Sequence, residues 1–207
     1  MQDDETGSWW QQITGEAILG ESKGRRLKLV QHDEVTFSVW KQEHPDGRVL
    51  IPDDSKPWKA FSENWEEETA KLPVNSELNP DTRLSPRTQI VGIKIGEAAK
   101  AYPISEIEQK SPILDRISET PIVIVMAEDR KSVRAFDRRI DARDLELFAK
   151  PDSRPLRLVD SETGSEWDFS GKCVNGKHAG KELKKIYILH DYWFDWKAYN
   201  PGTVIYQ

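Results

Sequence analysis

A short turn-like sequence occurs twice in this chain, and the same spacing of glycine, tryptophan and proline follows each copy. The two copies are Glu5-Thr6-Gly7-Ser8 and Glu162-Thr163-Gly164-Ser165. Beyond them, four residues recur at one offset of 156, with the pairs Gly15 and Gly171, Gly20 and Gly176, Trp40 and Trp196, and Pro45 and Pro201. Four identical letters arise easily by chance, but glycine, tryptophan and proline held at one offset indicate that one structural unit is present twice.

The two copies also constrain the fold class. In both, glycines separate short stretches in which apolar and polar residues alternate, which is typical of strands joined by turns. We predict a mainly β protein with a few short helices, built from two related strand-rich units that arose by internal duplication, the first of them incomplete. Residues 1–51 would be the C-terminal half of a first repeat, residues 52–88 a connector rich in proline and glutamate, and residues 89–207 a complete second repeat.

The first repeat is expected to lack a strand. In the second repeat the turn at residues 162–165 should join strands at residues 156–159 and 167–169, but only three residues precede Asp4. An open strand edge recruits other chains through its free N–H and C=O groups, so proteins usually cover it. The sequence therefore predicts either a fragment of a longer chain or a cover supplied by a partner chain or by the connector.

Local patterns predict the remaining elements. The most apolar run, residues 121–126, is predicted to be a central strand, because strands buried on both faces show continuous apolar residues. Two short helices are predicted, one at residues 34–43 with Asp33 as its N-cap and one capped by Asp191. A helical turn should follow Pro103. Further strands are predicted at residues 27–30, 48–51, 90–95, 98–102, 133–136, 145–148, 185–190 and 204–206.

Composition excludes several classes of protein. The net charge of −6 argues against nucleic-acid binding, which needs a clustered positive face. No apolar run approaches the roughly 18–20 residues that span a bilayer, and residues 1–30 lack the zones of a signal peptide. Cys173 is the only cysteine, which excludes an internal disulfide, and a small packed residue is its simplest interpretation.

The eight tryptophans fall into three groups. Trp40 and Trp196 occupy equivalent helices and are predicted to be core residues. Trp167, and either Trp9 or Trp10, should pack beneath the turns. The third group is Trp58, Trp65 and Trp193. None of these has a tryptophan at the corresponding position of the other repeat, so they are predicted to form a possible interaction surface. Aromatic residues beside carboxylates suit protein or sugar surfaces.

No set of residues predicts catalysis. The chain has no Gly-x-Ser-x-Gly elbow, and a carboxylate pair such as Glu162 and Asp168 arises freely among 36 acidic residues. A turn that occurs twice serves the fold better than it serves an active site. We predict no catalytic residue, no metal site and no cofactor, and we interpret the histidines as capping or turn residues. The sequence leaves open whether a metal binds any of His32, His44, His178 and His190.

Several segments, taken in order, resemble a family of proteins. Residues 92–104, 136–138, 162–167 and 193–201 are similar to DUF3179, a bacterial family of unknown function, and residues 5–18 with Trp40 and His44-Pro45 look like the first half of that family. The resemblance implies an exported, periplasmic or extracellular protein. Longer members carry an upstream Thr-Tyr-Cys-Pro-Leu-Cys motif that is absent here, and the matching strand at residues 123–128 has no cysteine. A metal or redox role is therefore not carried over.

Two functional hypotheses follow. The first is a β-rich binding or assembly protein without catalytic activity of its own, whose first repeat is completed by a protein partner or a second chain. The alternative is a fragment of an exported metal- or redox-dependent enzyme whose active residues lie upstream of Met1.

Overall fold

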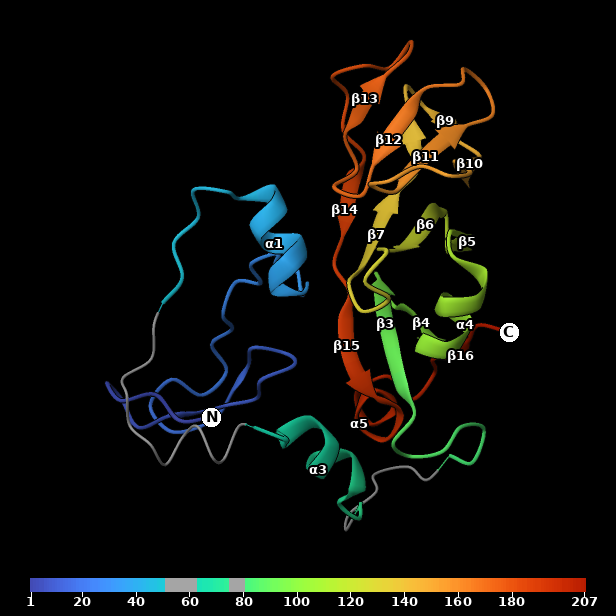
Figure 1. Cartoon of the computed structure of the whole chain (residues 1–207). Helices are drawn as coiled ribbons and strands as arrows, with labels where there is room; N and C mark the ends of the chain where they lie inside the picture. The colour runs from blue at the N-terminus through green and yellow to red at the C-terminus, as the bar shows by residue number, and fades with distance from the viewer. Residues whose placement is uncertain (51–62, 75–80) are drawn as a thin grey trace. The chain divides into compact units, whose positions relative to one another are not determined.

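The computed structural model describes residues 1–50, 63–74 and 81–207. In this part of the chain, short strands predominate over four short helices, which confirms the prediction of a mainly β protein (Figure 1). The chain divides into two compact units, residues 1–33 (the first unit) and residues 34–207 (the second unit). The division falls after Asp33 rather than after residue 51, because the segment that follows is hydrogen-bonded to residues 129–134 of the second unit.

The first unit is built around one small antiparallel pair. β1 (Trp9–Trp10) pairs with β2 (Ala17–Leu19). Gln2 forms a bridge to Trp9, so residues 1–3 already occupy part of the place of the strand that was predicted to be missing. Residues 27–30, predicted as a strand, form none. Of residues 1–33 only Ser8, Ala17 and Ser22 are buried, so the first unit has almost no hydrophobic core of its own.

One four-stranded sheet of the second unit has the order β15-β3-β4-β16. Its strands are β3 (Gln89–Ile95), β4 (Ala98–Pro103), β15 (Leu189–Tyr192) and β16 (Val204–Ile205). The predicted turn at residues 96–97 joins β3 to β4. Successive residues of β3 face different cores, since Ile90 packs with Trp193 and Trp196 of α5 (Trp193–Tyr199) and Val91 packs with the central sheet.

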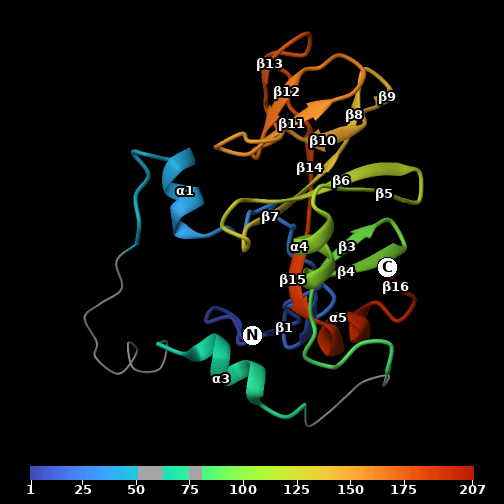
Figure 2. The same cartoon turned by 45° about the vertical axis from the view of Figure 1, so that its right-hand side comes forward.

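The central sheet has the order β14-β7-β6-β5, and Figure 2 shows it between the other two sheets. Its strands are β5 (Ile113–Ile117), β6 (Thr120–Met126), β7 (Val133–Asp137) and β14 (Lys184–Ile186). β6 is an interior strand with both faces buried. Ile122 and Ile124 pack in the cluster that contains Val91 of β3, whereas Val123 and Val125 pack in a second cluster, which contains Leu158 and Trp167. This double burial explains the continuous apolar run and confirms the predicted central strand.

The third sheet has the order β10-β11-β12-β13, and the small hairpin β8–β9 precedes it in the chain. The strands are β8 (Arg139–Ile140), β9 (Arg143–Asp144), β10 (Leu147–Ala149), β11 (Arg157–Asp160), β12 (Glu166–Asp168) and β13 (Cys173–Asn175). Leu158, Trp167 and Cys173 pack in one cluster with Val123 and Phe136 of the central sheet. The alternate residues of β11 and β12 therefore form the outward face of this sheet.

The helices begin at residues other than those predicted. α1 (Phe37–Glu43) has Thr36 as its N-cap, whose hydroxyl accepts the Val39 N–H, so the prediction of Asp33 was wrong. α5 follows Tyr192 directly, and Asp191 does not cap it because that residue belongs to β15. α4 (Ile104–Lys110) follows Pro103 as predicted. α3 (Trp65–Lys71) lies in the segment predicted as a connector.

Two predicted strands also differ. Residues 185–190 divide between β14 and β15, which belong to different sheets. Residues 48–50 form no strand, and residue 51 lies outside the described residues.

Candidate functional site

The turn between β11 and β12 is organised by Asp160. Its Oδ1 accepts hydrogen bonds from Thr163 N–H (2.6 Å) and Oγ1 (2.8 Å), and its Oδ2 accepts the Trp167 indole N–H (3.0 Å). The Thr163 and Ser165 hydroxyls lie 2.6 Å apart. Burial tends to raise the pKa of the Asp160 carboxyl, but the hydrogen bonds from Trp167 and Thr163 bring that pKa below its ordinary value. The carboxylate thus stays ionised as the centre of the turn.

The turn before β1 repeats this arrangement with Asp3. Asp3 accepts the Thr6 N–H (2.6 Å) and the Trp10 indole N–H (2.6 Å), and the Thr6 and Ser8 hydroxyls again lie 2.6 Å apart. The indole hydrogen bond and those from Thr6 lower the pKa of Asp3 to about 2. Trp10, rather than Trp9, therefore corresponds to Trp167. No role was predicted for either aspartate, although an Asp three residues before a Thr is a known turn signature.

The serine of each turn is enclosed by a glycine segment. The Ser165 hydroxyl accepts the His178 N–H (3.2 Å), and the Ser8 hydroxyl accepts the Ser22 N–H (3.0 Å). A Cβ added to Gly176 would lie 2.7 Å from Ser165 Cα, and Gly176 also has a φ of +96° that favours glycine. Both serines are fully buried. Both hydroxyls are thus engaged in hydrogen bonds inside their turns.

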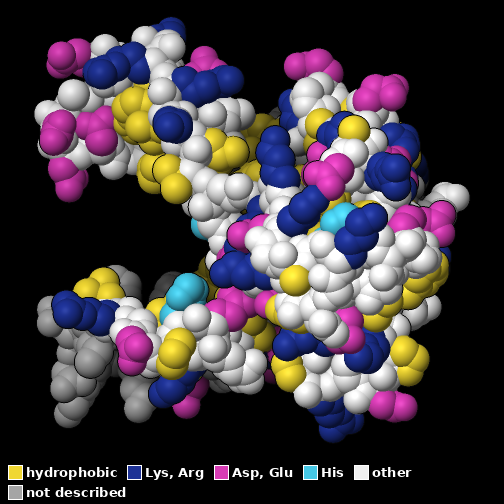
Figure 3. Space-filling view, turned by 90° about the horizontal axis from the view of Figure 1, so that it is seen from above, with side chains coloured by type: hydrophobic (Ala, Val, Ile, Leu, Met, Phe, Trp, Pro, Cys, Tyr) yellow, Lys and Arg dark blue, Asp and Glu magenta, His cyan; other side chains and the backbone are white. Residues whose placement is uncertain are grey.

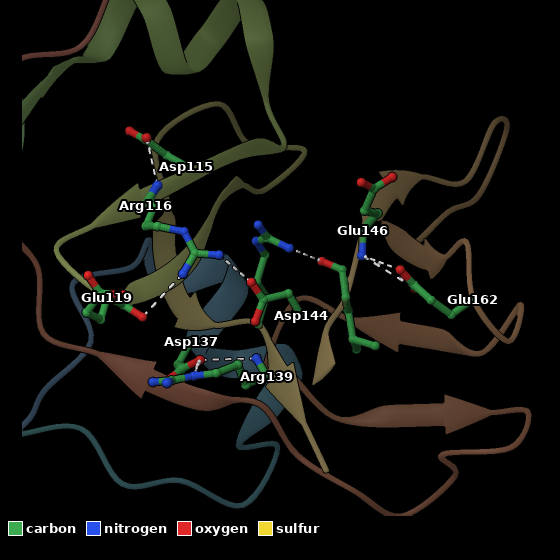
Figure 4. Close-up of polar contacts among 10 residues, drawn as sticks. Asp115, Arg116, Glu119, Asp137, Arg139, Asp144, Glu146 and Glu162 are labelled. Atoms are coloured by element: carbon green, nitrogen blue, oxygen red, sulfur yellow. Dashed lines mark hydrogen bonds and ion pairs between the residues drawn. The ribbon is translucent and has the colours of Figure 1, made fainter. Parts of the chain in front are cut away.

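The glutamates of the two turns differ in their contacts. The Glu162 carboxylate accepts the backbone N–H of Glu146 at 3.1 Å, which ties the turn to the segment before β10 (Figure 4). Glu5 is exposed. Figure 4 also shows that Arg116 is paired with Asp144 nearby, so the charges of this region stabilise one another.

The tryptophans only partly follow their predictions. Trp196 is buried, with an exposed fraction of 4%, and its indole donates to Thr203 Oγ1 at 2.9 Å. Trp193 is fully buried, so its prediction as an interaction surface was wrong, because residues three apart on α5 face the same sheet. Trp40 is only half-buried on a helix that buries none of its residues, so its prediction as a core residue was also wrong. Trp65 is exposed, and Trp58 lies outside the described residues.

A family model with the description "Protein of unknown function (DUF3179)" matches residues 1–203. The chain belongs to the DUF3179 family. No curated protein and no solved structure matches it. The family description names no reaction.

The corresponding apolar positions of this DUF3179 chain have the same local bonding but different burial. Leu183 has an exposed fraction of 2%, whereas Leu27, which corresponds to it, has 50%. Their backbones bond alike, since Leu183 N–H donates to Gly171 O and Leu27 N–H donates to Gly15 O, both at 2.9 Å. Likewise Trp193 is fully buried, whereas Phe37 of α1 is 59% exposed. Leu183 and Trp193 are thus part of a core, whereas the corresponding residues Leu27 and Phe37 are exposed to solvent.

The histidines and the cysteine have structural surroundings. His178 is buried beside the Trp167 ring at 6.0 Å, and His44 is the C-cap of α1. Cys173 is buried, and this burial raises the pKa of its thiol, which disfavours the reactive thiolate. Within residues 1–50, 63–74 and 81–207, no group of three or more His, Cys, Asp and Glu side chains is placed to hold a metal ion.

The surface and the helices add two observations. Figure 3 shows Lys and Arg side chains interspersed with Asp and Glu on the face that it presents. Among the described helices, none has both the length and the apolar character needed to cross a bilayer.

β15 carries two neighbouring titratable groups with shifted pKa values. His190 lies opposite Val91 and Asp191 opposite Ile90, so the two side chains are on opposite faces of the sheet. Burial lowers the pKa of His190, and the charge of Glu34 opposes that shift. Burial, with the charge of Asp195, raises the pKa of Asp191 to about 7. Because the two groups face different cores, they do not form one catalytic pair.

The Asp191 carboxyl makes stability depend on pH. It ionises near 3.8 in the unfolded chain but near 7 in the folded one, so the free energy of unfolding should fall as the pH rises from about 4 to 7. We expect Asp191→Asn to raise the free energy of unfolding at pH 8 by about 1–3 kcal/mol, after allowance for partial solvent exposure, and to leave it unchanged at pH 4. Urea unfolding at both pH values measures the difference. Asp152→Asn, which removes the same charge from an exposed position, should show no such pH dependence.

Proposed function

We propose that this DUF3179 chain is a binding or assembly protein without catalytic activity of its own. In this proposal the first unit and α1 are the incomplete copy of a duplicated structure, and strands of a partner protein complete it. The observation that carries the proposal is the contrast in burial between corresponding residues, above all Leu27 at 50% exposed and Leu183 at 2%. A turn so closely matched in hydrogen bonding is expected to need the same cover.

The contacts of the corresponding residues in the second unit indicate what that cover should look like. There, Trp167 and Leu183 pack against Val123 and Phe136 of the central sheet. Trp196 of α5 lies against Gly92 of β3, so closely that a Cβ on Gly92 would be 2.4 Å from the ring. The partner should therefore present aliphatic strand faces to the first unit and a glycine-bearing strand to Trp40 of α1. Burial of Leu27 and Phe37 would stabilise the complex by about 1–1.5 kcal/mol for each side chain, because each is already about half buried.

A second copy of this chain would not supply that cover. In every copy of the chain, β3 already packs against α5 of that chain, and β6 already packs against its β12. The proposed cover therefore comes from strands other than β3 and β6 of a second copy.

Hydrogen exchange tests the proposal on the isolated chain. Amides of residues 8–27 should exchange at least about 100-fold faster than those of residues 165–183, because matched hydrogen bonds without a core open more easily. Equal protection of the two segments in a monomer would show that the first unit needs no cover.

Site-specific crosslinking tests the partner itself. A photoreactive residue at Leu27 should give one defined adduct in cells, whereas the same residue at Val174, an exposed position in the second unit, should give none. Identical adduct patterns from the two positions would contradict the proposal.

A further inference from the structure

The second unit contains a groove between α1 and the outward face of the third sheet. Its volume is about 420 Å³, within the range of small-molecule sites. α1 forms one wall and β11 with β12 the other. Its lining includes Val39 from α1 and Leu156, Arg157 and Asp168 from the opposite side.

The wall formed by α1 is held in place by polar contacts. Thr36 donates from its hydroxyl to Asp129 (2.6 Å) and from its N–H to Ser132 (2.9 Å). At the other end of the helix, both carboxylate oxygens of Glu43 bind the guanidinium of Arg134, at 2.6 and 2.8 Å. Arg134 is buried, so these paired charges stabilise the position of α1.

The opposite wall carries a pair of charges that do not bind each other. Arg157 and Asp168 are directly opposed in the register of β11 and β12, so their side chains share one face. Within the described part of the chain, the one hydrogen bond from the Arg157 guanidinium goes to the Leu156 carbonyl at 3.3 Å, and Asp168 accepts hydrogen bonds from Ser170 and Lys172 through Oδ1 alone. On the same sheet, Lys150 and Glu166 do form an ion pair of 2.8 Å.

We propose that this groove binds the head group of an α-amino acid. The ligand carboxylate accepts hydrogen bonds from the Arg157 guanidinium, and its ammonium group donates to Asp168 Oδ2. The aliphatic part of the ligand lies between Val39 and Leu156. Electrostatics favours a zwitterion over a simple ion, since Glu166 and Asp168 flank Arg157 and repel an anion, while Arg157 repels a cation. This inference is independent of the proposed partner protein.

Three probes with the same aliphatic side chain test the proposal by calorimetry and by backbone amide shifts. L-leucine carries both charges, isopentylamine only the cation, and 4-methylpentanoate only the anion. We expect saturable binding of L-leucine with shifts at residues of both walls, and at least about 10-fold weaker binding of either single-charge probe. Binding of isopentylamine as tight as that of L-leucine would show an acidic cation site instead, and absence of saturation at about 10 mM L-leucine would overturn the proposal.

Variants separate the two charges from the rest of the sheet. Arg157→Gln and Asp168→Asn should each weaken L-leucine binding at least about 10-fold. Lys150→Gln removes a charge on the same face outside the groove and should alter binding less than about 2-fold. Asp168 also binds Ser170 and Lys172 in the turn that follows it, so Asp168→Asn could unfold the protein. The Arg157 side chain has no such role in a turn. Unchanged affinity in Arg157→Gln would therefore overturn the proposal by itself.

Discussion

Replacing Asp160 with alanine is expected to lower the free energy of unfolding of the second unit by about 3–5 kcal/mol. Asp160 is fully buried and accepts hydrogen bonds from Thr163 and the Trp167 indole. Without the carboxylate, those donors stay buried and unsatisfied, which costs more than the net value of the bonds themselves. Urea unfolding followed by tryptophan fluorescence gives the difference.

Two variants serve as controls for Asp160. Asp160→Asn keeps one carbonyl acceptor and should cost clearly less than the alanine variant. Asp3→Ala removes the corresponding carboxylate from the first unit, which is a separate compact unit, and should leave the unfolding of the second unit unchanged. A loss below about 1 kcal/mol in Asp160→Ala would show that the turn does not depend on this carboxylate.

Alanine at position 92 is expected to destabilise the second unit by about 2–4 kcal/mol. The new Cβ would lie 2.4 Å from two carbons of the Trp196 ring, and that ring is buried against β3. Either the ring or the strand must move, and both are held by the surrounding core. Thermal unfolding by near-ultraviolet circular dichroism follows both the stability and the environment of the tryptophan.

Gly202→Ala is the matched control for Gly92→Ala. Gly202 lies in the same region of the fold, and a Cβ there would meet no atom within 4 Å. The same methyl group should therefore change the stability by less than about 0.5 kcal/mol. Equal losses in the two variants would point to backbone entropy rather than to the contact with Trp196.

Much of the fold could be predicted because its signals are local. The apolar run of β6 identified the central strand, and the turn between β3 and β4 followed from Gly96. Whether a given residue is buried was harder to predict. Trp193 was expected at the surface because no tryptophan lies opposite it in the first copy, but burial depends on the sheet beneath α5 and not on that comparison.

The roles of individual aspartates were also hard to predict from the sequence. Asp33 and Asp191 both stand near helix starts, yet neither is a cap, since Thr36 caps α1 and Asp191 lies in a strand. Asp3 and Asp160, for which no role was predicted, instead accept hydrogen bonds from the indoles of Trp10 and Trp167. Similarly, the groove beside Arg157 joins residues from α1 to β12 that no local pattern connects.

By itself, the sequence determined the strand-rich class and the two turns at residues 5–8 and 162–165. Those features depend on contacts between residues a few positions apart and on glycines that adopt positive φ. Only the tertiary structure decided which copy of the turn has a core. Trp167 and Leu183 are buried because β6 and β7, distant in sequence, pack over them, whereas Leu27 has the same backbone bonding and remains half exposed.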